Sequence, residues 1–132
     1  MIDRVKAEIA ADDRIKLMGF LDDEQLAGFY GSIDVFALTS VNAFEAFGIV
    51  QVEAMMMGIP VIASDLPGVR VPARETGMGT IVRRRDAGAI TEALRVLPTM
   101  SFPDDGAARA RQLFHVDAST RAYERLAGRL RG

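Results

Sequence analysis

Two glutamates eight positions apart, Glu45 and Glu53, are the side chains in this sequence best placed to do chemistry. Glu53 lies in a run with helical periodicity, and its neighbours three and four positions away are all apolar. These neighbours are Ile49, Val50, Met56 and Met57. A carboxylate on an apolar face must find hydrogen-bond donors or a cation, or take up a proton. Glu53 therefore either contacts a ligand, or lies at the helix edge with its carboxylate reaching solvent, or pairs with an arginine elsewhere in the fold.

The start of this helix suggests an anion site. Phe47 and Gly48 end a loop that follows a predicted strand, so free N–H groups and the positive end of the helix dipole would face the crevice beyond that strand. From Gly48 to Glu53 the helix rises roughly 7 to 8 Å, at about 1.5 Å per residue. An extended ligand could touch Glu45, the helix start and Glu53 in turn. A sugar, a diphosphate and a ribose have this order.

The elements that must position these residues follow an α/β pattern. Short β-branched runs alternate with longer helical periods, which predicts a parallel sheet with crossover helices. We expect strands at 15–19, 35–38, 61–63 and 80–82. Helices are expected near the N-terminus, after Asp22 with Gln25 completing a capping box, at 48–57, after Asp86, and in an arginine-rich segment from about 104 to 131. Only turns are expected between Asp65 and Gly79.

An ordered series of motifs covers nearly the whole chain. The series runs Ile15-Lys-Leu-Met-Gly-Phe, Asp22-Asp-Glu-Gln-Leu, Asp34-Val-Phe-Ala-Leu-Thr-Ser, Glu45-Ala-Phe-Gly, Glu53-Ala-Met, Gly58-Ile-Pro-Val-Ile-Ala-Ser-Asp, Gly77-Met-Gly and Arg85-Asp-Ala. It resembles the donor-binding domain of retaining nucleotide-sugar glycosyltransferases with two Rossmann domains (GT-B), in the group 1 or family 4 branch with a Glu-x7-Glu motif. This resemblance implies a Rossmann-like, three-layer α/β/α fold, the incomplete C-terminal half of a GT-B architecture.

The resemblance also implies residue roles. Glu45 matches the residue that hydrogen-bonds the transferred sugar near its anomeric carbon, which makes it the catalytic candidate. Glu53 matches the carboxylate that grips the ribose hydroxyls. Gly19 and Phe20 fall where the base pocket of the family begins. The positions whose backbone contacts the sugar and diphosphate are Phe47, Gly48, Ile49 and Val50.

The reaction implied by the resemblance transfers a hexose from a nucleoside diphosphate sugar to an acceptor hydroxyl, with retention of configuration. No metal or other cofactor is expected, because a helix N-terminus and basic side chains stabilise the leaving diphosphate in such enzymes. The partners that the resemblance implies are the nucleotide-sugar donor and a sugar or lipid-linked acceptor.

Two positions depart from the family pattern: Thr39 stands where proline is common, and Pro67 replaces a glycine.

The resemblance further predicts that residues 1–132 are a single, N-terminally truncated domain. Two strands that precede the match in the family, with the Arg and Lys that neutralise the diphosphate, have no counterpart here, nor does the acceptor-binding domain. Segment 15–19 would then lie apart from the other strands. We expect a fragment of a longer enzyme that is inactive alone; the alternatives are a non-catalytic nucleotide-sugar-binding module and a nucleotide-sugar 2-epimerase fragment.

The C-terminal helices and the run Arg83-Arg84-Arg85 have two interpretations each. Tyr123, Leu126 and Leu130 form an apolar stripe, which favours packing against the domain over a peripheral membrane contact. The arginine run is more typical of a solvated face than of a site for phosphate or anionic lipid.

Composition excludes several classes of function. The 132 residues include no Cys and one His, which rules out disulfides and a thiolate metal site, and a net charge of −2 argues against nucleic acid as a partner. The longest apolar run, about 55–63, is too short and too interrupted to span a bilayer. No signal or transit pattern opens the chain, so the expected location is the cytoplasm, with the inner membrane face as the alternative.

Overall fold

Three parallel strands form one sheet in the order β1-β2-β3: β1 (Phe36–Leu38), β2 (Val61–Ser64) and β3 (Gly79–Val82). The register pairs Phe36 with Val61, and Val61 with Gly79. The computed structural model describes residues 2–42 and 44–130. The strands expected at 35–38, 61–63 and 80–82 are confirmed to within one residue at each end.

The helices are α1 (Ile2–Ala11), α2 (Asp23–Ser32), α3 (Ile49–Met56), α4 (Arg70–Thr76), α5 (Ala87–Val96), α6 (Gly106–Phe114) and α7 (Val116–Leu130), with a short 3-10 turn at Leu97–Thr99. Two predicted caps are confirmed: Asp22 forms a capping box with Gln25, and Asp86 accepts a hydrogen bond from the Ala89 N–H. The sequence analysis missed α4, where only turns were expected. Pro72 lies in the first turn of α4, where its missing N–H leaves no helical bond unmade.

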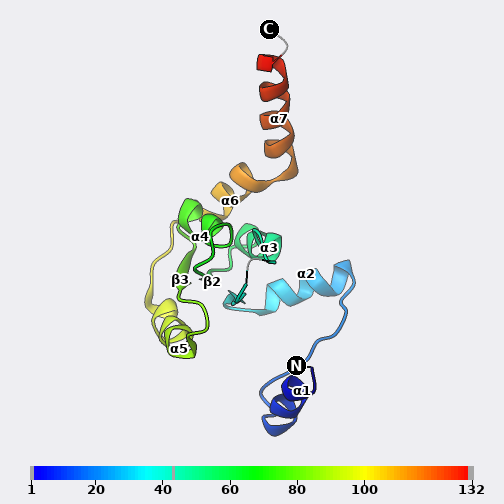
Figure 1. Ribbon diagram of the computed structural model, residues 1–132, viewed down its shortest axis with the longest axis vertical. Coiled ribbons are helices and arrows are strands. Elements are labelled where there is room, and N and C mark those ends of the chain that lie inside the picture. The colour runs from blue at the N-terminus through cyan, green and yellow to red at the C-terminus, as the bar shows by residue number, and fades with distance from the viewer. Residues whose placement is uncertain (1, 43, 131–132) are drawn as a thin grey trace.

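Helices cover both faces of the sheet, which confirms the three-layer α/β/α fold (Figure 1). Alternate residues of β2 enter different cores, because side chains on a strand alternate between faces. Val61 and Ala63 pack with residues of α2, α3, α4 and α6, whereas Ile62 packs with Val82 and with Ala93 of α5. All four residues of β2 are buried, as expected for the central strand of a parallel sheet.

The strand predicted at 15–19 is wrong for this chain. Residues 15–19 belong to no strand, and Ile15, Leu17 and Met18 are about half exposed or more. In Figure 1 α1 and the segment after it stand away from the sheet. A strand exists only with a hydrogen-bonded neighbour, and within the described residues nothing pairs with this segment.

The two C-terminal helices differ in their packing. In α6, Ala110 is fully buried and the Arg111 guanidinium donates a hydrogen bond to the Met56 carbonyl oxygen. In α7, Tyr123 is 74% and Leu126 53% exposed, so the expectation that this stripe packs on the domain is wrong for α7. The chain takes an extended conformation at His115, and Figure 1 shows α7 projecting away from the sheet. The side chain of Leu130 lies outside the described residues.

Within the described ranges, no helix is both long enough and apolar enough to cross a membrane.

Candidate functional site

The start of α3 is a helix N-terminus without a side-chain cap. Gly48 is the N-cap residue and has a left-handed conformation (φ 79°), and a Cβ at this position would collide with the Leu38 side chain of β1. The first N–H groups of any helix lack acceptors within the helix. Ile49 and Val50, which follow, are 67% and 37% exposed. This end of α3 can therefore receive an anion through backbone N–H groups and the helix dipole.

Gln51 fastens this helix start to the loop that follows β2. Its side chain is fully buried, and its amide nitrogen donates to the carbonyl oxygens of Phe47 (2.7 Å) and Val69 (2.8 Å). In the same loop Gly68 lies so close to the Ala46 carbonyl that any Cβ there would overlap it. The two loops are thus locked backbone to backbone at the carboxyl edge of the sheet. The sequence analysis did not select Gln51; its position among apolar helical residues is the signal that was available.

The partner of Glu53 is a buried phenol. The Tyr30 hydroxyl lies 2.9 Å from Glu53 Oε2 and 3.2 Å from the Val50 carbonyl oxygen. Burial, and then the bond to Glu53, raise the pKa of Tyr30 above its ordinary value, so the hydroxyl remains a proton donor at neutral pH. Within residues 2–42 and 44–130, Glu53 therefore has a tyrosine partner in place of the arginine considered from the sequence.

Glu53 also borders an open pocket with mainly apolar walls between α2 and α3. The pocket is lined by Asp23, Leu26, Ala27, Tyr30, Glu53, Met56 and Met57. Glu53 itself is half-buried, so a group in the pocket can still reach its carboxylate. An apolar pocket with a fixed carboxylate in its wall suits a ligand that combines a flat or apolar part with hydroxyl groups.

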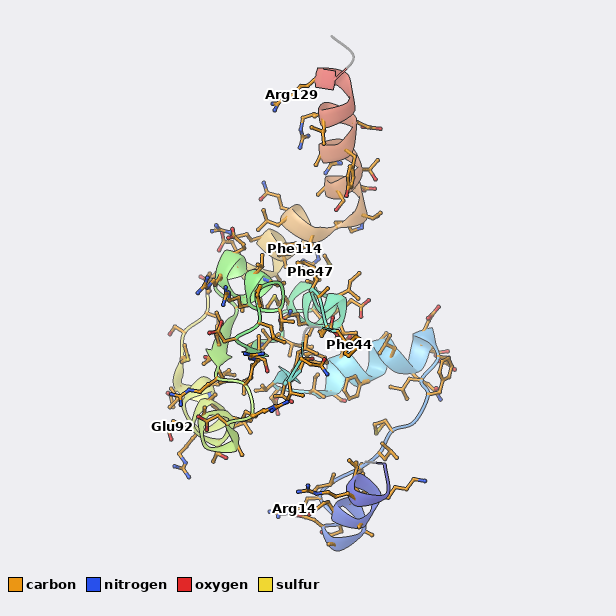
Figure 2. All side chains as sticks on the ribbon, in the orientation of Figure 1. Arg14, Phe44, Phe47, Glu92, Phe114 and Arg129 are labelled. Atoms are coloured by element: carbon orange, nitrogen blue, oxygen red, sulfur yellow. The ribbon has the colours of Figure 1, made fainter. Side chains whose placement is uncertain are left out.

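Glu45 and Phe47 lie in the loop between β1 and α3. Glu45 is half-buried, three residues before the bare helix start. The Phe47 ring packs edge-on against Phe114 of α6, with ring centres 5.5 Å apart, and Figure 2 shows the two residues together at this junction. The half-buried side chain of Phe47 is therefore engaged with α6, which leaves its backbone as the part that can face a ligand. Phe44, in the same loop, is 96% exposed.

Gly19 and Phe20 are not gathered with the other candidate residues. Gly19 has a left-handed conformation (φ 70°), and the Phe20 ring is 95% exposed. Both belong to the segment between α1 and α2 that stands outside the sheet (Figure 1). Their role at a base pocket stays a prediction.

Arginines gather where β2 and β3 end. Arg70 forms an ion pair with Asp65 (2.6 Å), and this hydrogen bond, with lesser effects of Arg74 and Arg84, holds the pKa of Asp65 below its ordinary value. Arg83, Arg84 and Arg85 are all exposed, as expected of a solvated face. Within the described residues, no group of three or more His, Asp or Glu side chains is arranged to hold a metal ion.

The parallel sheet with helices on both faces and the bare helix start after β1 match a glycosyltransferase domain of the GT-B type. The family model of the group 1 glycosyl transferases matches residues 4–106, and the chain belongs to this family.

Curated relatives agree with this assignment. A phosphatidyl-myo-inositol mannosyltransferase of Mycobacterium leprae is 39% identical over 85 residues, which are 64% of this chain and 22% of that protein. A D-inositol 3-phosphate glycosyltransferase of Geodermatophilus obscurus is 31% identical over 127 residues, 92% of this chain and 28% of the relative. The chain thus spans between a fifth and a third of the length of these relatives.

A solved structure supports the same fold. A sucrose-phosphate synthase from Thermosynechococcus elongatus superposes with a TM-score of 0.78 at 32% identity, over 98% of this chain and 33% of that one. The superposition includes nearly every element described above, so the arrangement of α2, α3 and the sheet is shared with an enzyme of known structure.

Proposed function

We propose that this chain forms the donor-binding part of an enzyme that transfers a hexose from a nucleoside diphosphate sugar to an acceptor hydroxyl, with retention of configuration. The observation that carries the proposal is the pairing, on one helix, of an uncapped N-terminus at Gly48 with a fixed, half-buried carboxylate at Glu53. The first feature suits a diphosphate and the second a ribose diol. Membership of the group 1 family supports the same reaction class.

The proposed roles follow the order of groups along the donor. Glu45 would bind the hydroxyls of the transferred sugar near the reacting carbon. The backbone N–H groups from Gly48 to Val50 would bind the diphosphate and stabilise the charge that builds on it as the glycosidic bond breaks, without a metal ion. Glu53 would accept hydrogen bonds from the ribose.

For the acceptor, only the chemical class is proposed. The relatives include a phosphatidyl-myo-inositol mannosyltransferase and D-inositol 3-phosphate glycosyltransferases, and the inositol in both names carries hydroxyl groups. A sugar or lipid-linked acceptor is therefore proposed, bound by parts of a longer protein beyond this chain. The names of these relatives favour transfer over 2-epimerisation.

A non-catalytic module that binds nucleotide sugars is the second candidate. The feature that favours it is that the groups proposed to bind the donor, from Glu45 to Glu53, lie close together in this chain. Product formation from a radiolabelled donor separates the two candidates, because a module binds the donor and releases it unchanged.

Removing the Glu53 carboxylate tests the donor site. Glu53→Ala should weaken nucleoside diphosphate binding by about 1–3 kcal/mol, because charge-assisted hydrogen bonds to the ribose are lost. Isothermal titration calorimetry with ADP, GDP and UDP, on the protein expressed from its full coding sequence, gives the comparison. Glu92→Ala is the matched control, since Glu92 is an exposed glutamate on α5 (Figure 2). Equal affinities of wild type and Glu53→Ala would contradict the ribose role.

A further inference from the structure

We propose that Tyr30 is a positioning residue for nucleotide binding: its buried hydroxyl holds the Glu53 carboxylate in the orientation that receives the ribose hydroxyls. This inference rests on the proposed function, because it assigns to Tyr30 a part in the same site. Tyr30 lies in α2, 23 residues before Glu53, and is joined to it by a hydrogen bond of 2.9 Å. Nothing in the local sequence around either residue indicates that they meet.

The position of the Tyr30 hydroxyl is fixed from two elements. The ring is only 6% exposed, and it packs against Phe29 of α2 (centres 5.7 Å apart) and Phe36 of β1 (6.1 Å). A ring held on two sides cannot swing its hydroxyl away without disturbing the core. Tyr30 is therefore a rigid donor, unlike a lysine or arginine on a flexible stem.

The hydroxyl holds Glu53 against the first turn of α3. Glu53 Oε2 and the Val50 carbonyl oxygen both lie within hydrogen-bond reach of the Tyr30 oxygen, at 2.9 and 3.2 Å. A phenol has one proton, and the shorter contact with the charged acceptor is the stronger bond. Val50 and Glu53 are three residues apart, on one face of the helix, and side chains on a helix lean toward its N-terminus. The carboxylate is thereby directed toward the end of α3 where the diphosphate is proposed to bind.

One carboxylate oxygen remains for the ligand. Across residues 2–42 and 44–130, the structure gives hydrogen bonds to Glu53 Oε2 from Tyr30 and none to Oε1. The pocket beside Glu53 is bounded by α2, by Met56 of α3 and by Met57, the residue that follows α3. A free glutamate side chain loses rotamer freedom when it binds a ligand, and this loss weakens binding. The bond from Tyr30 removes most of that loss before the ligand arrives.

The protonation state of Tyr30 suits this role. Burial and the neighbouring Glu53 both raise the pKa of the phenol above its ordinary value of 10.0. The carboxylates at this pocket are Glu53 and Asp23, and the charge of Glu53 disfavours a phenolate. The hydroxyl therefore keeps its proton, and can donate it to Glu53, at neutral pH.

Tyr30→Phe removes the hydroxyl and keeps the ring in the core. We expect affinity for the best-bound of ADP, GDP and UDP to fall about 3- to 10-fold, because the freed Glu53 side chain would then lose its rotamer freedom on binding. Affinity for inorganic pyrophosphate, which would meet only the helix start, should stay within about twofold, because that ligand does not reach Glu53. Tyr123→Phe is the matched control, since Tyr123, the other tyrosine of the chain, is 74% exposed on α7.

The outcomes of this calorimetric experiment are separable. A selective loss of nucleoside diphosphate affinity in Tyr30→Phe, absent from Tyr123→Phe, supports the inference. A second outcome is that wild type binds nucleoside diphosphates and that Tyr30→Phe has the same ratio of nucleoside diphosphate affinity to pyrophosphate affinity as wild type. This outcome overturns the positioning role, while the proposed function stands. If wild type binds no nucleoside diphosphate, the proposed function fails and this role fails with it.

A second measurement needs no ligand. In a Tyr123→Phe background, Tyr30 is the only tyrosine, and its ionisation can be followed by absorbance near the tyrosinate band. Glu53→Gln should lower the pH at which Tyr30 ionises, because a negative charge beside the phenol has been removed. A Tyr30 ionisation curve that Glu53→Gln leaves unchanged over the pH range in which circular dichroism shows both proteins folded would show that the two side chains are uncoupled, and it would overturn the inference whatever the nucleotide experiments give.

Discussion

Two buried polar side chains, those of Tyr30 and Gln51, position the groups of this site. Tyr30 holds the Glu53 carboxylate, and Gln51 holds the carbonyl oxygens of Phe47 and Val69. Each bond joins α3 to a different element, so the helix start is fixed relative to α2 on one side and to the loop after β2 on the other. Buried hydrogen-bonded groups of this kind determine geometry more than they add stability.

The Gln51 side chain offers a test at this scale. Gln51→Leu should lower the free energy of unfolding by about 1–3 kcal/mol, because two carbonyl oxygens near the core lose their donor. Urea denaturation followed by circular dichroism measures the change. The matched control is Gln112→Leu, which alters an exposed residue of α6 and should leave the midpoint almost unchanged. A Gln51→Leu midpoint equal to the wild-type midpoint would mean that the two bonds contribute nothing.

Glu53 was recognisable in the sequence because its neighbours on the helix are apolar, but its partner was not. Tyr30 and Glu53 are 23 residues apart, and their contact depends on how α2 packs against α3. The contacts of Gln51 could not be predicted for a related reason: its two acceptors are backbone carbonyl oxygens, which carry no signature in the sequence. The candidate site could thus be predicted as a set of residues, and its supporting contacts could not.

At the scale of elements, local signals decided what could be predicted. The caps at Asp22 and Asp86 were confirmed because capping depends on residues only three positions apart. The helix α4 was not predicted because the turn residues on either side of it, such as Pro67 and Gly77, dominated the local pattern; Pro72 is tolerated in its first turn. Segment 15–19 has strand-like residues but no strand, since pairing depends on a neighbour that local sequence cannot supply.

Arg85 marks a strained point between β3 and α5. It is the one residue other than glycine with a positive φ (58°) within residues 2–42 and 44–130. Arg85→Gly should raise the free energy of unfolding by up to about 1 kcal/mol, because the left-handed conformation costs an L residue more than the added chain entropy costs glycine. Thermal unfolding by calorimetry measures this change.

The control for Arg85 is its neighbour. Arg84→Gly removes the same charge and adds the same flexibility at a position without positive φ, so we expect its melting temperature to fall or stay level. If both variants shifted the melting temperature equally, strain at Arg85 would have no part in the stability of this turn.

At the scale of the whole molecule, the sheet and its flanking helices form one body, while α1 and α7 lie outside it (Figure 1). The apolar stripe of α7 predicted its amphipathic character, but whether such a stripe packs depends on which surfaces are present to receive it. The chain spans 33% or less of the relatives described, and the donor site proposed here lies within residues 4–106, which the family model matches.

The central claim is that the N-terminus of α3 receives the diphosphate of a nucleotide sugar. It is tested most directly by the shifts of backbone amide resonances when a nucleoside diphosphate is added to ¹⁵N-labelled protein. We predict that the largest shifts occur at Gly48, Ile49 and Val50, with smaller ones at Glu53, and that pyrophosphate alone reproduces the first group. If saturation with nucleotide left the resonances of these three amides unmoved while others shifted, the diphosphate would not bind at the N-terminus of α3.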